Sequence, residues 1–307
     1  MKIFLIVLGS IIGFLLILFL IIGLIGYRKL YRREKVEYDV LTVPEDKFPF
    51  PGSVLSKCRE FRATPHEEIY ITSPRGHKLY GELRKSEIPQ EGTPTIILFA
   101  HGFKSSGSND EPLFGNFQMK KYDLLTIDHE GCGLSEGKCS GFGVYEQENI
   151  RLWVKKINEI YDHKVNIFLH GVSMGCNSVL LTASYEMENV KGIIGDCGYV
   201  STFKMVRCLV KLNILSFMIC LFNSMVLRKN IFKYSTLKTL RESKYPILFI
   251  HGAEDKFVPT YMSVLNDKAC TSKHKLVFFE GATHAMSYLS NPSLYENEFD
   301  SFILENK

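Results

Sequence analysis

The stretch that decides the fold runs from Ile167 to Gly175 and reads IFLHGVSMG. It starts as an apolar strand, and a helical pattern follows it. Between the two stands Gly171-Val172-Ser173-Met174-Gly175, a G-x-S-x-G sequence at a strand-to-helix turn. Glycines at both ends allow a turn tight enough to lift the serine hydroxyl clear of the sheet. The stretch therefore predicts a nucleophilic Ser173 with the positive end of a helix directly behind it.

Strand-length apolar runs recur along the chain, and helical patterns lie between them. The predicted buried strands are Thr95–Ala100, Asp123–Ile127, Val165–His170, Lys191–Gly195, Pro246–Ile250 and Lys275–Phe279. A hairpin, Glu68–Thr72 with Lys78–Leu83, precedes them, and the helical patterns cover residues 145–161, 176–186, 260–270 and 293–305. The alternation predicts an α/β fold with a mostly parallel sheet flanked by helices. In such a sheet the reactive groups lie beyond the carboxyl ends of the strands.

A serine hydroxyl is a weak nucleophile, so Ser173 needs a base, and the base needs a carboxylate that orients it. Asp255 and His284 follow Ser173 in the order expected for this fold, each in the loop after a predicted strand. We expect His284 to act as general base and acid, and Asp255 to orient it. Asp196 also ends a strand and is the main alternative to Asp255, while Glu254 is a weaker one.

The remaining histidines fit structural positions better than catalytic ones. His163 and His274 lie in polar connections before strands, at the edge of the sheet away from Ser173. His101, His170 and His251 each end a different strand, and no acidic ligand stands at helical or hairpin spacing from them. We expect these three to be packed strand ends, and we expect neither a metal nor a cofactor.

An oxyanion hole requires two backbone N–H groups aimed at the developing negative charge. One donor should be Met174, which follows the nucleophile. The other should come from the loop at residues 100–106, with Phe103 as the expected donor and Gly102 allowing close approach of the backbone.

Six segments of the chain resemble the serine aminopeptidase-like group of α/β hydrolases, which also includes esterases and acyl hydrolases. They are residues 100–102, 128–137, 171–175, 195–199, 251–255 and 281–284. The resemblance extends over about residues 66–305 and implies the α/β-hydrolase fold with a Ser-Asp-His triad. One segment departs from the pattern: Glu130-Gly131-Cys132-Gly133 stands where relatives usually carry Arg-Gly-His-Gly. This exchange is expected to alter the charge near the site.

The N-terminal segment, residues 3–26, is apolar apart from Ser10 and is long enough to cross a bilayer. A cleaved signal peptide is the alternative, but this run is longer than usual and no small-residue cleavage site precedes Tyr27. Basic residues follow the run, at Arg28, Lys29, Arg32, Arg33 and Lys35. This bias predicts a single span with the catalytic domain facing the cytoplasm. The same cluster could equally bind anionic headgroups.

We predict three parts: an anchor at residues 1–27, a juxtamembrane linker at 28–62 and a hydrolase domain at 63–307. The linker contains Pro44, Pro49 and Pro51, which suggest loose packing. Within the domain, an insertion at about residues 201–243 should form a helical cap over the site, as the family resemblance implies. Its apolar part, Met205–Leu227, suggests an acyl or aromatic substrate pocket; it could also dip into a membrane interface or pack on its own core.

The overall composition excludes some functions. The formal net charge is +4, and the basic residues are not striped along one segment, so we expect no nucleic-acid partner. The eight cysteines show no C-x-x-C pair, which favours buried thiols, although Cys132 and Cys139 could pair.

The sequence thus predicts a serine hydrolase that cleaves an ester or thioester of a hydrophobic acyl group. The alternatives are a peptidase or amidase with the same triad, and a scaffold of this fold without catalysis.

Overall fold

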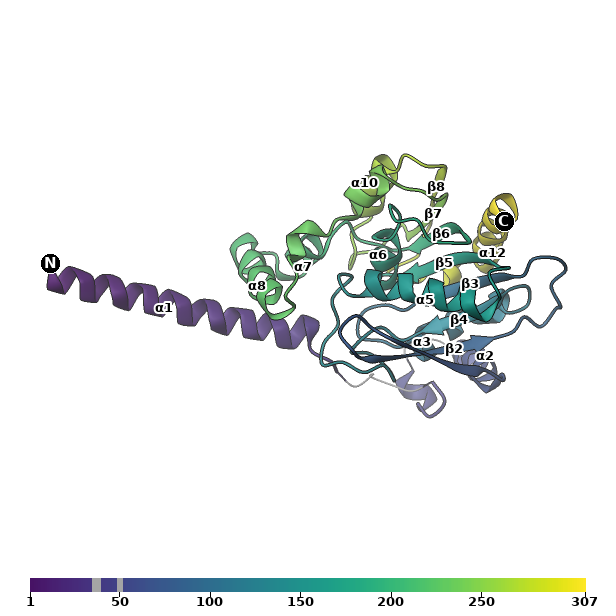
Figure 1. Cartoon of the computed structure of the whole chain (residues 1–307), viewed down its shortest axis with the longest axis horizontal. Helices are drawn as coiled ribbons and strands as arrows, with labels where there is room; N and C mark the ends of the chain where they lie inside the picture. The colour runs from purple at the N-terminus through teal and green to yellow at the C-terminus, as the bar shows by residue number, and fades with distance from the viewer. Residues whose placement is uncertain (35–39, 49–51) are drawn as a thin grey trace.

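The computed structural model of the 307-residue chain describes residues 1–34, 40–48 and 52–307. Within this part, eight strands form one sheet in the order β1-β2-β4-β3-β5-β6-β7-β8 (Figure 1). Their bounds are β1 Glu67–Thr72, β2 Lys78–Arg84, β3 Thr95–Ala100, β4 Asp123–Ile127, β5 Asn166–Val172, β6 Val190–Asp196, β7 Ile247–Gly252 and β8 His274–Phe279. Strand β2 pairs antiparallel with β1 and β4, and every other pairing is parallel. The predicted α/β-hydrolase fold is confirmed.

Helices cover both faces of the sheet. Successive side chains of a strand point to opposite sides, so a strand that is apolar throughout presents an apolar surface on each face. In β3, Ile96 and Leu98 pack into one apolar cluster, while Ile97 and Phe99 pack into another. The first cluster is closed by α5 (Glu146–Ile160), α6 (Met174–Leu180) and α9 (Thr236–Arg241). The second is closed by α2 (Gly52–Ala63), α4 (Pro112–Gln118) and α12 (Pro292–Asn306).

The cap is the chain between β6 and β7. It contains α7 (Thr202–Val210), α8 (Asn213–Val226) and the short 3-10 helix η3 (Ile231–Lys233) before the chain returns through α9. Shorter helices complete the domain: α3 (Gly107–Asp110), α10 (Tyr261–Ala269) and α11 (Ser287–Ser290). The expected helical insertion is therefore present, and Figure 1 shows it on the side of the domain that faces the N-terminal helix.

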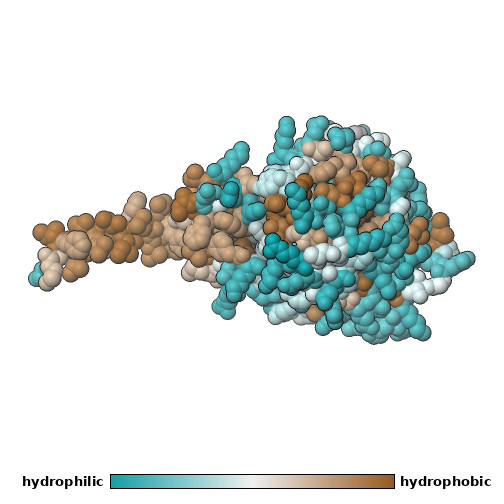
Figure 2. All heavy atoms as spheres, turned by 90° about the horizontal axis from the view of Figure 1, so that it is seen from above, coloured by the Kyte–Doolittle hydropathy of each residue, from teal (hydrophilic) through white to brown (hydrophobic). Residues whose placement is uncertain are grey.

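The N-terminal helix α1 (Lys2–Gly26) continues into one turn of π-helix, η1 (Tyr27–Tyr31). It is long and apolar enough to cross a membrane, and its most apolar stretch is not covered by the rest of the chain. Figure 1 shows it projecting away from the domain, and Figure 2 shows an almost entirely apolar surface along it.

The segment after α1 is tied to the domain, although the sequence suggests a loose linker there. Tyr31 is almost fully buried, and its carbonyl accepts the Ser140 N–H at 2.9 Å. Farther on, the 3-10 helix η2 (Glu45–Lys47) precedes α2, whose Phe61 lies in the core. Residues 35–39 and 49–51, which include Lys35, Pro49 and Pro51, lie outside the described residues. The described part of this segment therefore packs against the domain, whereas its prolines and charges predicted a loose linker.

Candidate active site

The turn at Ser173 is as tight as the sequence predicts. Strand β5 ends at Val172 and α6 begins at Met174, with Ser173 between them at φ 55° and ψ −110°. A non-glycine residue in this region costs about 1–3 kcal/mol and persists only where the surroundings enforce it. Both flanking glycines are required, because a Cβ at Gly175 would overlap the carbonyl oxygen of Ala100 and one at Gly171 would overlap Gly175. The strained turn holds the serine at the carboxyl end of the sheet.

His284 and Asp255 lie in line with the serine. The Nε2 atom of His284 is 3.0 Å from the Ser173 hydroxyl, and its Nδ1 is 2.7 Å from Oδ2 of Asp255. An ionised carboxylate only accepts hydrogen bonds, so the ring proton lies on Nδ1 and Nε2 is left to accept the Ser173 proton. The three residues come from the loops after β5, β7 and β8, far apart in the chain, and the parallel register brings them together.

Asp255 is fixed by more partners than the sequence indicates. Its Oδ1 accepts the backbone N–H groups of Phe257 at 2.8 Å and Val258 at 2.9 Å. Its Oδ2 accepts from His284 and lies 3.1 Å from Nε2 of His251. Burial alone would raise the pKa of Asp255, but the hydrogen bonds from His251 and His284 outweigh it and hold the pKa well below its ordinary value. The carboxylate therefore stays charged beside the His284 imidazole.

The alternative carboxylates occupy other positions. Asp196 is fully buried at the end of β6, and its Oδ1 accepts the Ser287 hydroxyl at 3.3 Å rather than the imidazole of His284. Burial raises the pKa of Asp196 to about 6, against the opposing effect of His251 and His284. Its backbone oxygen accepts the Ser173 N–H at 2.9 Å, which helps to hold the turn. Glu254 is exposed.

The histidines expected to be structural have structural partners. His170 lies between Gln118 at 3.0 Å and Tyr295 at 3.2 Å. His101 lies 2.7 Å from the Gly102 carbonyl through Nδ1 and accepts the His129 N–H at 3.0 Å. His251 is the exception among the strand-end histidines, because it also contacts Asp255. The expectation that no acidic residue stands at helical or hairpin spacing from the strand-end histidines is wrong for His251, because Asp255 follows it by four residues.

His163 and His274 lie before β5 and at the start of β8, away from the carboxyl ends of the strands. Each lies near an acidic residue, Glu188 at 3.0 Å and Asp267 at 3.6 Å.

The loop after β3 brings a second backbone donor near the serine. The Gly102 N–H donates to Oδ2 of Asp110 at 2.7 Å, and a Cβ at Gly102 would lie 3.7 Å from the Cβ of Ser173. Asp110 also accepts the Ser105 hydroxyl at 2.5 Å, which ties the loop to the last residue of α3. Among the hydrogen bonds of the described residues, the N–H groups of Phe103 and Met174 have no partner. These are the two N–H groups that the sequence predicts as oxyanion donors.

One group of potential metal ligands lies within the site. Donor atoms of Cys197, Asp255 and His284 lie within 4.8 Å of one another. Burial raises the pKa of the Cys197 thiol well above its ordinary value, whereas a metal would bind the thiolate. The hydrogen bond between Asp255 and His284 already uses the other two donors. This donor set fits a proton-transfer line better than a metal site.

Glu130, where the chain departs from the family pattern, forms an ion pair with Arg75. Arg75, in the β1–β2 turn, donates to both carboxylate oxygens of Glu130 at 2.7 and 2.5 Å, and His77 lies 2.8 Å from it. The Arg75 guanidinium also lies 3.5 Å from the centre of the Tyr145 ring. Burial alone would raise the pKa of Glu130, but Arg75 and His77 lower it overall. The glutamate therefore fastens the hairpin turn to the loop after β4.

The cap joins the active site through one apolar cluster. Met174 and Phe103 pack in the same cluster as Met205 and Val206 of α7 and Ile219 of α8. Ser173 itself is only 5% exposed, so its surroundings are largely closed to water.

The chain is similar in sequence to one family model and to several known proteins. The sequence model of the family described as "Serine aminopeptidase, S33" matches residues 93–236. The uncharacterized protein YqkD of Bacillus subtilis (strain 168) is 24% identical over 236 residues, which cover 73% of this chain and 76% of that protein. The α/β-hydrolase domain-containing protein WAV2 of Arabidopsis thaliana is 24% identical over 75% of this chain and 76% of its own length.

Solved structures share the fold. The Pyrococcus furiosus esterase Pf2001 superposes with a TM-score of 0.63 at 20% identity, over 80% of this chain and 93% of that one. An acylaminoacyl peptidase of Pyrococcus horikoshii gives a TM-score of 0.59 at 18% identity, over 77% of this chain and 41% of that one.

Proposed function

We propose that this chain, which belongs to the α/β-hydrolase superfamily, cleaves carboxylic ester or thioester bonds of a hydrophobic acyl substrate through Ser173, His284 and Asp255. The observation that carries the proposal is the hydrogen-bonded line from Asp255 through His284 to Ser173. A serine hydrolase is also what the family match and the fold neighbours support.

The geometry suits an acyl-enzyme mechanism. The Ser173 oxygen attacks the carbonyl carbon while His284 Nε2 takes its proton. The negative charge that develops on the carbonyl oxygen accepts hydrogen bonds from the N–H groups of Phe103 and Met174, an interaction typically worth ~3–4 kcal/mol for one donor. The bond to the leaving group then breaks, and His284 returns the proton to the departing oxygen or sulfur. Water, activated by the same imidazole, attacks the acyl-serine and releases the acid.

The preference for an acyl ester is supported by the apolar cluster that links the cap to Met174 and Phe103. The alternative, a peptidase or amidase with the same triad, is favoured by the serine aminopeptidase family match and the likeness to an acylaminoacyl peptidase. A panel of esters, thioesters, acyl-amides and aminoacyl-amides with one shared acyl group separates the two. Faster turnover of the amides would replace the ester proposal with the alternative.

A fluorophosphonate probe tests the nucleophile. We expect the wild-type chain to be labelled and to hydrolyse p-nitrophenyl esters, and both properties to be lost in Ser173→Ala. The matched control is Ser178→Ala, which removes a buried hydroxyl on α6 that donates only to the Met174 carbonyl. An unlabelled wild-type chain, correctly folded by circular dichroism, would favour a scaffold without catalysis.

We also propose that α1 is an uncleaved anchor, that residues 63–307 form the hydrolase domain and that this domain faces the cytoplasm. The length and apolarity of α1 support the anchor, and the basic residues after it, from Arg28 to Arg33, support the orientation. Protease added to intact cells should leave the domain whole. Cleavage of the domain from outside would reverse the orientation.

A further inference from the structure

The cap helix α8 presents an apolar stripe to the outside of the molecule. Ile214, Phe217, Leu221 and Met225 are 62%, 46%, 38% and 65% exposed. Their spacing of three or four residues places all four on one face of the helix. No charged residue occurs between Asn213 and Val226. Such a stripe on one helix is more than the scattered single exposures that a soluble surface normally carries.

The opposite face of α8 already has a core to pack on. Ser216, Ile219, Cys220 and Asn223 are buried there. The two polar side chains among them donate to backbone carbonyls one turn earlier, Ser216 to Leu212 and Asn223 to Ile219, both at 2.8 Å. The amide oxygen of Asn223 has no partner among the described residues. The described part of the chain therefore covers one side of α8 and leaves the apolar stripe for something outside it.

A third side of α8 is packed against the end of α1. Gly23 and Gly26 are the buried residues of α1, and a Cβ on Gly23 would overlap the Phe222 ring while one on Gly26 would come within 2.6 Å of Ile219. The rings of Phe19 and Phe222 meet edge to face at 6.0 Å. Figure 1 shows α8 beside α1, and Figure 2 shows the apolar surface of α1 continuing into the body where they meet. The stripe is thus continuous with a helix that can cross a bilayer.

The contact also sets the depth of α8. At ~1.5 Å per residue, about twenty helical residues cross a hydrocarbon core of ~30 Å. A helix that enters the hydrocarbon core at Ile3 therefore reaches its other side near Ile22. Gly23 and Gly26 then lie at the boundary between acyl chains and headgroups. An apolar helix face at this boundary is buried by about 5–10 Å.

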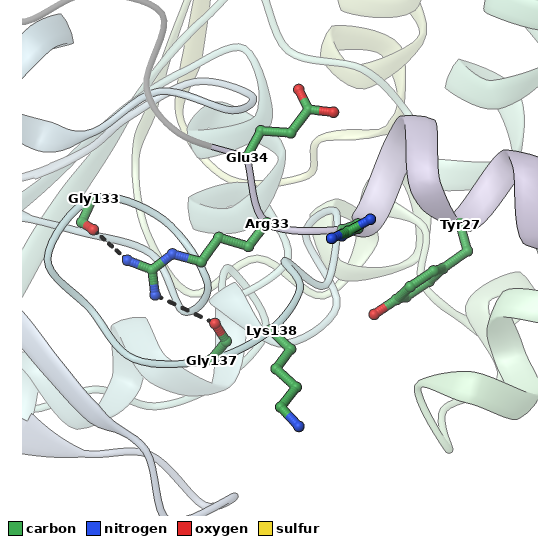
Figure 3. A pocket seen from close by; sticks show the side chains of 7 residues that line it. Tyr27, Arg33, Glu34, Gly133, Gly137 and Lys138 are labelled. Carbon is green, nitrogen blue, oxygen red and sulfur yellow. Dashed lines mark hydrogen bonds between the residues drawn. The ribbon is translucent and has the colours of Figure 1, made fainter.

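A basic hollow lies at the same level, at the end of α1. It has a volume of about 610 Å³ and is lined by Tyr27, Arg32, Arg33, Glu34, Gly133, Gly137 and Lys138. Figure 3 shows the Arg33 side chain reaching into the loop that holds Gly133 and Gly137. It donates to the carbonyls of Gly133 at 2.6 Å and Ser135 at 2.8 Å, and Glu34 pairs with Lys104 at 2.8 Å. These contacts hold the domain against the end of α1. The basic side chains Arg32, Arg33 and Lys138 can interact favourably with negatively charged lipid headgroups.

From these observations we propose that α8 inserts its apolar stripe into the leaflet reached by the C-terminal end of α1, and that the substrate is a lipid-like acyl ester taken from that leaflet. The substrate class rests on the proposed esterase function; the insertion does not. The argument for the substrate is that the cluster formed by Ile219 and Met205 also contains Met174 and Phe103. One apolar cap therefore has the bilayer on one side and the oxyanion donors on the other.

Tryptophan fluorescence tests the insertion without any catalysis. The full chain carrying Phe217→Trp is reconstituted in vesicles that contain lipids brominated on the acyl chain. The control is Leu304→Trp, a similarly exposed position on α12, which Figure 1 places at the opposite end of the domain. The native Trp153 is fully buried among α5 and the sheet, and gives a constant background.

We expect bromolipid to quench the emission of Trp at position 217 and to leave that at position 304 at the level of the background. Equal quenching at the two positions would overturn the insertion. A response at position 217 to protein concentration, without quenching by bromolipid, would overturn it in favour of a second copy of the chain on this face.

A second experiment tests the substrate class. The double variant Phe217→Ser with Met225→Ser is compared with Leu304→Ser by the ratio of two rates: hydrolysis of a long-chain acyl ester in vesicles and hydrolysis of a water-soluble acetyl ester. Because two large apolar side chains lose their membrane contact, we expect this ratio to fall roughly tenfold or more in the double variant alone. An unchanged ratio would overturn the leaflet as the source of substrate. Fluorophosphonate labelling of every variant shows separately whether Ser173 is active, so failure of the esterase proposal is recognised independently.

Discussion

Replacing Asp255 with asparagine should change the tautomer of His284 rather than the fold. The two backbone N–H groups that Oδ1 accepts, at 2.8 and 2.9 Å, can be met only by the oxygen of the new amide. Its NH₂ group must then take the place of Oδ2, which lies 2.7 Å from His284 Nδ1. An NH₂ group donates, so the imidazole has to accept at Nδ1 and carry its proton on Nε2, where it can no longer accept the proton of Ser173.

We therefore expect Asp255→Asn to lose most of the contribution of the base, a fall in kcat of about 10⁴-fold, or about 5 kcal/mol. Asp196→Asn is the matched control, because Asp196 is equally buried but contacts Ser287 rather than the imidazole. Ester turnover and the rate of fluorophosphonate labelling measure both variants, and thermal melting checks that each is folded. The assignment of the carboxylate is refuted if Asp196→Asn is the slower enzyme, or if Asp255→Asn keeps more than about a tenth of wild-type kcat, a loss of only about 1.4 kcal/mol.

Three other variants test the scaffold around the site. Burial raises the pKa of Glu111 to about 8 from its ordinary 4.5, so the folded chain holds a proton that the unfolded chain releases, and the free energy of unfolding should fall as pH rises through this range. Glu111→Gln should abolish that fall in urea titrations at pH 5 and 8.5, and an unchanged pH dependence would contradict it. Gly175→Ala should destabilise by about 1–3 kcal/mol or prevent folding, because the new Cβ overlaps the Ala100 carbonyl oxygen; a melting temperature equal to that of wild type would show that the turn can relax. Asp110→Ala removes the acceptor of the Gly102 N–H and should lower kcat by up to about 100-fold by displacing the oxyanion loop, while wild-type kcat would mean that the loop holds its position without this bond.

The sequence by itself determined the features that depend on local chemistry. The G-x-S-x-G segment around Ser173 needs only its own backbone and the strand before it, so its turn could be predicted from the residues. The strand and helix pattern likewise predicted the parallel sheet, since a strand buried on both faces must be apolar throughout. Asp255 and His284 could be proposed because each follows a strand, and parallel strands end at one edge.

Tertiary structure alone decided the contacts that join segments without a fixed spacing. The approach of His284 to Asp255 rather than to Asp196 depends on how two loops settle beyond the sheet. The Arg75–Glu130 pair links a hairpin turn to a loop 55 residues away.

The largest addition made by the structure lies at the N-terminus. The sequence predicted an apolar helix and an apolar cap separately, and it left open whether the cap packs on its own core or meets a membrane. Within an apolar helix, the glycines Gly23 and Gly26 do not by themselves predict which segment packs against them. The folded chain places Phe222 against Gly23 and Ile219 against Gly26. The hydrophobic effect favours burial of an apolar face but does not depend on which segment buries it. The sequence pattern therefore predicts which faces are buried, and only tertiary packing decides which segments bury them.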